Sequence, residues 1–299
     1  MSLRALRRVF MGALVLLAGA GSAAAQDLAG IRDSGVLRHL GVPYANFVTG
    51  AGDGLDVELV RGFAAHQGLR YRFVETDWRR VLGDLTGRHA RRAAHGAELL
   101  GETPVRGDVA AHGMTVLDWR AQVVRFSRPT FPSGVWLVAR ADSPLEPITP
   151  TGDITRDIAR VKARLQGVPV LALPDTCLDP ALYGIAATGA AVRLQPPGRK
   201  LSEMVPAILK NDAEATLLDV PDALIALDRW PGQVKVIGPV SREQRMAAAF
   251  RPGSPRLREA FDAYLAEVRR DGRYRRLVES YYPEVPHHFG DFFAGPGGG

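Results

Sequence analysis

Cysteine is nearly absent from this chain of 299 residues, in which Cys177 stands alone. One thiol excludes an internal disulfide, even in a compartment that would permit one. The chain also lacks a G-x-S-x-G elbow, a G-x-x-x-x-G-K-[ST] loop and an H-E-x-x-H pair, so the common hydrolase, nucleotide-binding and metalloprotease motifs are missing. His287 and His288 are adjacent but have no further ligands at matching spacing, and we therefore expect neither a metal nor a cofactor.

Long apolar runs are confined to the first 25 residues. Three features follow one another there: the basic residues Arg4, Arg7 and Arg8, an apolar run over 9–20, and small residues at 23–25 before Gln26. This order is typical of a secretory signal peptide, which we predict over 1–25. A membrane anchor is the alternative, but the run is shorter than the roughly 20 residues of a spanning helix, and nothing later resembles one. Because no cysteine is available there for acylation, we expect a soluble protein in the periplasm of a Gram-negative bacterium.

A strong excess of one charge sign is also missing. The formal net charge of +6 falls to +3 once the three arginines before Gln26 are removed, because no acidic residue precedes Gln26. The remaining basic residues are interleaved with Asp and Glu, as over 258–276, which is the usual pattern of a solvated helix face. We therefore expect no nucleic-acid partner.

The length predicts two lobes, because removing 25 of 299 residues leaves 274, more than the roughly 100 to 200 of a typical domain. Strand-like runs at 134–139 and 234–238 each end in residues that cannot continue them, and we interpret both as crossings between lobes. The expected ranges are 30–139 plus 242–287 for lobe 1, 140–241 for lobe 2, and a disordered tail at 288–299. Short strands that alternate with amphipathic helices indicate an α/β fold. The last long helix is expected to present one apolar face: Leu257, Phe261, Tyr264, Leu265 and Val268.

The segment GMTVLDWRAQVVRFSRPTF, at 113–131, places Arg120 five residues after Thr115 and just before a strand-like run. A guanidinium donates two parallel hydrogen bonds to a carboxylate, and a nearby hydroxyl with free backbone amides satisfies the remaining lone pairs. The spacing therefore suits a carboxylate pocket, although most arginines in a chain with 38 Lys+Arg are solvated surface charges.

The same segment resembles the GMTIT-PER-AKVVDFSDPYY motif of the bacterial extracellular solute-binding proteins of family 3, the amino-acid-binding type. The likeness continues in order at 35–47, 54–64, 215–227 and 254–283. It implies a two-lobed α/β fold, the type II periplasmic binding protein, with two hinge crossings and a ligand cleft between the lobes. The SREQRMAAAF region also resembles the N-terminal binding domain of membrane-bound murein lytic transglycosylases, whose separate catalytic domain we do not expect after the C-terminal PEVPHHFGDFFAGPGGG.

The resemblance also assigns the charged groups of a ligand. Arg120 and Thr115 match the residues that hold a carboxylate, and Gly113 matches a glycine whose backbone meets the ligand. Asp219 follows a strand-like run and matches the residue that binds an amine, since a buried carboxylate needs a cationic partner. The alternative is that Asp219 is the N-cap of the helix that follows.

Three aromatic residues match the walls of such a cleft: Tyr44, Phe47 and Trp78. Aromatic faces cover aliphatic, aromatic or cationic groups, so they do not identify the ligand, and ordinary core packing is the alternative. Residues 87–106 replace a short turn of the family, and this insertion is either a flap near the cleft or a solvent loop.

The loop at 173–184 lies where the family has a Q-x-GTT turn that leads into a helix. Backbone amides at such a helix start favour a ligand carboxylate. Thr176 keeps the pattern, but Asp175 replaces a glycine and Cys177 replaces a hydroxyl residue. A ligand role for Thr176 and Cys177 therefore stays open.

These features predict a monomeric periplasmic protein, not an enzyme, that binds a small zwitterion such as an amino acid. Its expected partner is the membrane permease of an ABC transporter or a sensor. One enzyme class stays open, because some periplasmic dehydratases of prephenate-like acids share the fold. In that case Asp219 would be a proton donor.

Overall fold

The computed structural model describes residues 27–196 and 200–294. The predicted signal peptide at 1–25 lies outside the described residues. Within the described part of the chain, no helix is long and apolar enough to span a bilayer.

Lobe 1 is built on a five-stranded sheet, and its strands lie in this order: β2 (Arg70–Glu75), β1 (Val36–Gly41), β5 (Val109–Ala110), β14 (Ala249–Phe250) and β6 (Arg125–Phe126). The helices of this lobe are α1 (Leu28–Ser34), α2 (Leu55–His66), α3 (Val81–Thr86), α4 (Asp118–Ala121), α8 (Pro255–Arg270) and α9 (Arg273–Tyr281). The predicted apolar face of α8 is confirmed, since its buried residues are Leu257, Phe261, Tyr264, Leu265 and Val268. That face packs on lobe 1, where Phe261 contacts the rings of Phe63 and Phe250.

Lobe 2 is built on a second five-stranded sheet, in the order β10 (Ala191–Leu194), β9 (Pro169–Ala172), β11 (Ala215–Asp219), β8 (Val135–Arg140) and β12 (Val234–Pro239). Its helices are α5 (Ile154–Lys162), α6 (Met204–Leu209) and α7 (Val220–Arg229), with short 3₁₀ turns η1 (Pro180–Tyr183), η2 (Ala186–Thr188) and η3 (Leu201–Glu203). Every residue of β11 is buried, which is typical of a central strand covered on both faces.

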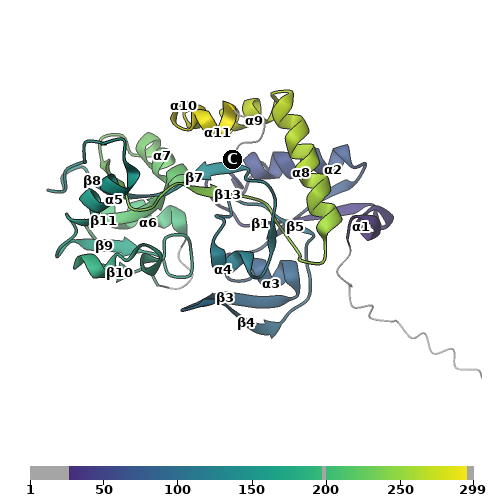
Figure 1. Ribbon diagram of the computed structural model, residues 1–299, viewed down its shortest axis with the longest axis horizontal. Coiled ribbons are helices and arrows are strands. Elements are labelled where there is room, and N and C mark those ends of the chain that lie inside the picture. The colour runs from purple at the N-terminus through teal and green to yellow at the C-terminus, as the bar shows by residue number, and fades with distance from the viewer. Residues whose placement is uncertain (1–26, 197–199, 295–299) are drawn as a thin grey trace, which may run out of the picture.

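The two lobes are joined by a short antiparallel pair, β7 (Phe131–Ser133) and β13 (Gln244–Met246), in which Ser133 lies opposite Gln244. Figure 1 shows this pair between the two sheets, with the C-terminal helices above it. The chain passes from lobe 1 to lobe 2 through β7 and returns through β13. The predicted arrangement of two α/β lobes with two crossings is confirmed.

The first boundary lies earlier than the sequence predicted. Residues 134–139 were expected to end lobe 1, but β8 pairs antiparallel with β11 and with β12 in the sheet of lobe 2. An apolar run shows that a strand is buried without showing which sheet buries it. The first crossing therefore lies at β7, before residue 134.

The prediction of a disordered tail is wrong for residues 288–294. This part of the chain lies in α10 (Val285–His288) and α11 (Gly290–Ala294). Phe292 is 8% exposed, with the Arg269 guanidinium 5.1 Å from its ring centroid, and Phe293 stacks on Tyr274 at 6.5 Å. The burial of Phe292 and the stacking of Phe293 stabilise a short helix that composition alone would leave disordered. Residues 295–299 lie outside the described residues.

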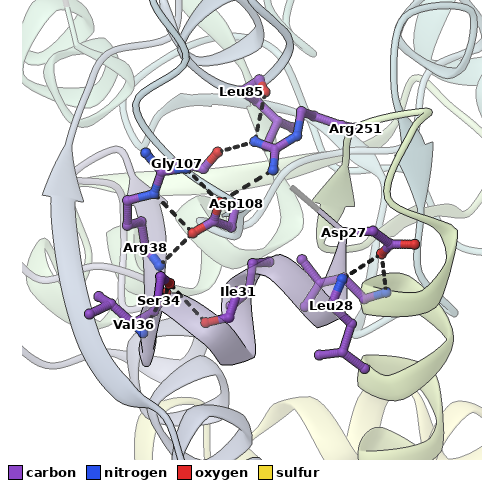
Figure 2. Close-up of polar contacts among 11 residues, drawn as sticks. Asp27, Leu28, Ile31, Ser34, Val36, Arg38, Leu85, Gly107, Asp108 and Arg251 are labelled. Carbon is purple, nitrogen blue, oxygen red and sulfur yellow. Dashed lines mark hydrogen bonds and ion pairs between the residues drawn. The ribbon is translucent and has the colours of Figure 1, made fainter. Parts of the chain in front are cut away.

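A buried ion network ties three segments of lobe 1 together (Figure 2). Arg38 donates to both carboxylate oxygens of Asp108, from Nη2 at 2.7 Å and from Nε at 3.0 Å. Arg251 donates to Asp108 Oδ1 at 3.3 Å and to the Gly107 carbonyl at 2.6 Å. Because Asp108 and Arg251 are 1% and 2% exposed, each group depends on the other to offset its desolvation.

Candidate functional site

Polar residues from both lobes meet at the boundary between them. In lobe 1, α4 positions Arg120 shortly after Thr115; in lobe 2, β11 ends at Asp219. Tyr44 of lobe 1 donates its hydroxyl hydrogen to Asp219 Oδ1 at 2.6 Å, which connects the lobes directly. Arg120 is 4% exposed and Asp219 is fully buried, so the structure places the two predicted charge partners inside one interlobe cluster.

Arg120 is a buried cation with few polar partners. Its guanidinium lies 5.7 Å from the ring centroid of Trp78 and 5.4 Å from that of Trp119. One of its five N–H donors bonds to the Thr115 carbonyl at 2.9 Å, and it has no ion pair within the described residues. Burial lowers the pKa of Arg120, and charge interactions with Cys177, Tyr183 and Asp219 raise it by a smaller amount. A guanidinium this poorly compensated favours an anion placed beside it.

Asp219 occupies the N-cap position of α7, but its side chain makes no capping hydrogen bond. Its carboxylate instead accepts from Tyr44 at Oδ1 and from the Cys177 thiol at Oδ2, the latter at 3.2 Å. Burial raises the pKa of Asp219, while the hydrogen bonds from Tyr44 and Cys177 lower it. Asp219 therefore bonds to one residue of each lobe, Tyr44 and Cys177. It also lies at the N-cap position of α7, where the backbone amide of Asp222 contributes to lowering its pKa.

Three residues that the sequence analysis did not include complete the cluster. Tyr183 donates to the carbonyl of Cys177 and accepts from Gln244 Nε2 at 3.0 Å. Asp222 follows Asp219 by one helical turn and is 9% exposed; burial, and then the charge of Asp219, raise its pKa. Each had a sequence signal, since Asp222 shares a motif with Asp219, Gln244 lies in the predicted crossing and Tyr183 lies in the loop at 173–184.

Buried polar atoms without a hydrogen-bond partner gather at the same boundary. Five residues of the described part of the chain carry six such atoms there: His112 with both ring nitrogens, Thr115 Oγ1, Ser133 Oγ, Asp222 Oδ2 and Gln244 Oε1. They come from lobe 1, from lobe 2 and from the β7–β13 pair that joins the lobes. Buried polar groups in folded proteins are normally paired. Their concentration here distinguishes the lobe boundary from the rest of the described chain.

Trp78 is the aromatic residue that spans the cluster. Its ring lies 5.6 Å from that of Tyr44 and 4.8 Å from that of His112, both in edge contact, and its face meets the Arg120 guanidinium. Burial lowers the pKa of His112 to about 3, so this imidazole is neutral near pH 7. The structure thus brings Tyr44 and Trp78 to the cluster, where the sequence analysis expected them.

Phe47 and Gly113 lie behind the cluster. Phe47 is fully buried and packs on Phe131 at 5.0 Å, which is the core packing that the sequence analysis kept as the alternative. The Gly113 N–H donates to Asp56 Oδ2 at 2.6 Å, so an internal carboxylate already engages this amide. Glycine is required here, because φ is +68° and a Cβ would lie 2.5 Å from the Phe47 ring.

The loop at 173–184 uses its threonine internally. The Thr176 hydroxyl donates to the Leu173 carbonyl at 2.8 Å and accepts from the Leu178 N–H at 3.0 Å, so it stabilises the turn itself. Asp175 adopts φ +62°, the left-handed conformation that a glycine takes at lower cost, and it is exposed. Cys177 is the residue of this loop whose side chain reaches Asp219.

No group of three or more metal-ligating side chains occurs in the described residues. A surface depression of about 550 Å³ is lined by residues of β6 and α8, including Phe126, Arg258 and Asp262. It shares no residue with the interlobe cluster.

The two lobes, the paired crossings and the buried cluster between them define a protein that encloses a small ligand. The model of the bacterial extracellular solute-binding proteins, family 3, matches residues 104–284. The chain therefore belongs to this family, as the motifs predicted.

Solved structures similar to this chain share its fold, the type II periplasmic binding protein. An ancestral arginine-binding protein bound to arginine is 21% identical, with a TM-score of 0.65 over 83% of this chain and 98% of its own. AncCDT-1, an ancestral amino acid-binding protein described as a precursor of cyclohexadienyl dehydratase, is 20% identical, with a TM-score of 0.64 over 85% of this chain and 98% of its own. At this identity the likeness establishes the fold.

A curated relative is the membrane-bound lytic murein transglycosylase F of Desulfosudis oleivorans (strain DSM 6200 / JCM 39069 / Hxd3). It is 24% identical over 234 residues, which make up 78% of this chain and 44% of the relative. The chain thus spans less than half the length of that protein. The predicted likeness to transglycosylases of this type is confirmed.

Proposed function

We propose that this protein captures a small zwitterion, an amino acid or a close derivative, in the periplasm. One observation carries the proposal: a buried guanidinium without an ion pair, Arg120, and a buried carboxylate, Asp219, lie in one cluster but on opposite lobes of the described chain. The carboxylate of an amino acid would bind Arg120 in a bidentate manner. Its ammonium would bind Asp219, which accepts more than two hydrogen bonds when ionised.

Ligand binding of this kind drives closure. A molecule that bridges Arg120 and Asp219 makes both contacts only when the lobes are together, so it shifts the population toward the closed form by that differential affinity. We propose that a permease of an ABC-type importer recognises the closed form, with a sensor as the alternative partner. The signal peptide predicted at 1–25 supports a periplasmic location, and we propose that the protein acts as a monomer.

The charges of the cluster favour a ligand with an additional cationic group. Asp219 and Asp222 contribute two carboxyl groups against one guanidinium, Arg120. Burial raises the pKa of both carboxyl groups, and a cationic ligand group beside them would favour their ionised form. His112 is neutral because burial lowers its pKa to about 3. Asp222 Oδ2 also lacks a partner within the described residues. The structural relative with bound arginine has a ligand of this charge. L-arginine is therefore our first candidate, with L-citrulline as its neutral isostere.

A second candidate is dehydration of a prephenate-like acid. It is favoured by the buried carboxyl group of Asp222, whose raised pKa keeps a proton available for a leaving hydroxyl group. The sequence had pointed to Asp219 as the proton donor of such a reaction, and Asp222 lies one helical turn after it. The likeness to a dehydratase precursor supports the same possibility.

The test is a thermal-shift panel followed by calorimetry. The panel contains L-arginine, L-citrulline, neutral amino acids, dicarboxylates and prephenate, since a ligand that binds the native state raises Tm by mass action. We expect a selective amino-acid hit that is recovered unchanged. Conversion of prephenate during the assay would support the dehydratase instead, and a panel in which dicarboxylates bind and amino acids do not would contradict the role of Asp219.

A further inference from the structure

The inserted hairpin makes a contact between the lobes that is separate from the buried cluster. Its strands are β3 (Arg88–Ala93) and β4 (Gly96–Glu102), paired antiparallel, and Figure 1 shows them below α3 and α4 of lobe 1. From β3, Arg92 reaches lobe 2, where its Nη2 and Nε lie 2.9 Å and 3.2 Å from Asp179 Oδ2. Of the two predicted alternatives for 87–106, the structure thus supports a flap over a solvent loop.

The carboxylate that receives Arg92 is held in place by its own segment. Asp179 is buried. Its Oδ1 accepts from the Ala181 N–H at 2.9 Å, as the N-cap of η1, and its Oδ2 also accepts from the Asp175 N–H at 3.3 Å. In the same turn, Leu182 packs on an apolar cluster of lobe 1 that the hairpin alanines also contact. The ion pair and an apolar contact therefore both join this turn of lobe 2 to lobe 1.

The hairpin is also attached to the helix that carries Arg120. Gln122 follows α4 and accepts from the Ala97 N–H at Oε1, at 3.0 Å. Gly96 adopts φ +127°, and a Cβ there would lie 2.4 Å from the Gln122 amide, so the turn of the hairpin fits closely on α4. The hairpin that carries Arg92 and the helix that carries Arg120 are therefore attached to each other.

We propose that Arg92 and Asp179 form a latch that holds the lobes closed and slows ligand release. The two side chains belong to different lobes and are 24% and 9% exposed, so solvent and salt screen this pair less than a surface pair. Within the described residues, the side-chain hydrogen bonds of Arg92 go to Asp179 alone and to no residue of the interlobe cluster. The pair therefore adds free energy to the closed form specifically, and the apparent affinity rises with the fraction of closed protein. The part of this inference that concerns release rests on the proposed function.

The first experiment needs no ligand. Hydrogen–deuterium exchange is compared for the wild-type protein, Arg92→Gln and Arg91→Gln. Arg91 is the matched control, because its side chain pairs with Glu98 inside the same hairpin at 2.8 Å and reaches lobe 2 only through a weaker charge interaction with Asp175. We expect Arg92→Gln to speed exchange at least about threefold in the peptide 175–184 of lobe 2. Unchanged exchange there, or an equal change in Arg91→Gln, would overturn the latch.

The second experiment measures release of L-arginine by stopped flow across a double-mutant cycle with Arg92→Gln and Asp179→Asn. In Asp179→Asn, the amide oxygen of the new side chain still accepts from the Ala181 N–H, so the N-cap of η1 is kept. Each single variant should release L-arginine about three to ten times faster than the wild type. The double variant should release it no faster than either single variant. Added salt should speed release from the wild type more than from the variants. Additive effects of the two changes would overturn the latch. If the wild type does not bind L-arginine, the proposed ligand fails, and the exchange experiment alone decides the latch.

Discussion

Replacement of Arg120 by methionine should separate ligand binding from stability. The guanidinium is 4% exposed, makes one hydrogen bond and lies between two indole rings. Removal of a poorly compensated buried charge gains several kcal/mol of desolvation energy, and the loss of two cation–π contacts, at about 0.5–2 kcal/mol each, offsets part of it. We therefore expect the free energy of unfolding to rise by about 1–2 kcal/mol, or Tm by about 2–8 °C at this size.

The same substitution should nearly abolish binding. A ligand carboxylate that loses its charge partner in a dry site loses about 2–5 kcal/mol, which corresponds to roughly 30- to 5,000-fold weaker affinity for L-arginine. Thermal unfolding followed by circular dichroism measures the first effect, and titration calorimetry measures the second.

Arg251→Met is the matched control for this prediction. Arg251 is equally buried, at 2% exposed, but it is paired with Asp108 and with the Gly107 carbonyl. Its loss leaves a buried carboxylate with one cation fewer and should destabilise the protein by about 3–5 kcal/mol. If Arg120→Met destabilised the protein as much as Arg251→Met and L-arginine still bound, Arg120 would be a structural residue and the binding site would lie elsewhere.

Three further substitutions test other parts of the site. Asp219→Asn keeps the size of the side chain but removes its charge, so calorimetry should show the affinity for L-arginine reduced by at least about 30-fold. The affinity for 5-guanidinopentanoate, which lacks the α-amino group, should fall by less than about threefold. Equal losses for the two ligands would refute the ammonium role. Asp56 has a pKa raised from 3.8 to about 7 by burial, so the native state holds a proton that the unfolded state has lost between about pH 4 and pH 7. Stability should therefore fall by up to roughly 4 kcal/mol as pH rises through that window, and Asp56→Asn should remove this slope in urea titrations. Gly113→Ala places a Cβ 2.5 Å from the Phe47 ring and should lower the free energy of unfolding by about 2–4 kcal/mol in the same titrations. The control is Gly68→Ala, at φ +69° with open space around it, which should lower it by only about 1 kcal/mol. Equal losses would show that the contact with Phe47 is unimportant.

The sequence alone predicts local features of this protein well. The apolar face of α8 follows from its helical spacing, and the buried strand that ends at Asp219 follows from its uninterrupted apolar run. The motif at 113–131 predicts Arg120 and Thr115 as carboxylate ligands, because such a site needs a guanidinium and a hydroxyl close together in the chain, and this role stays a prediction. These signals are readable because the residues involved lie within one element or one turn of each other.

The choice of partners was decided by the tertiary structure. Tyr44 and Asp219 are 175 positions apart and Arg92 and Asp179 are 87 apart, and both contacts exist only because two separate sheets are brought together at the β7–β13 crossing. The assignment of β8 to lobe 2, the helix that buries Phe292, and the inclusion of Tyr183 and Gln244 in the cluster depend on the same long-range packing. Periodicity and composition report how a residue relates to its near neighbours in the chain. Strand order and lobe closure determine which distant side chain it meets, and no local pattern contains that information.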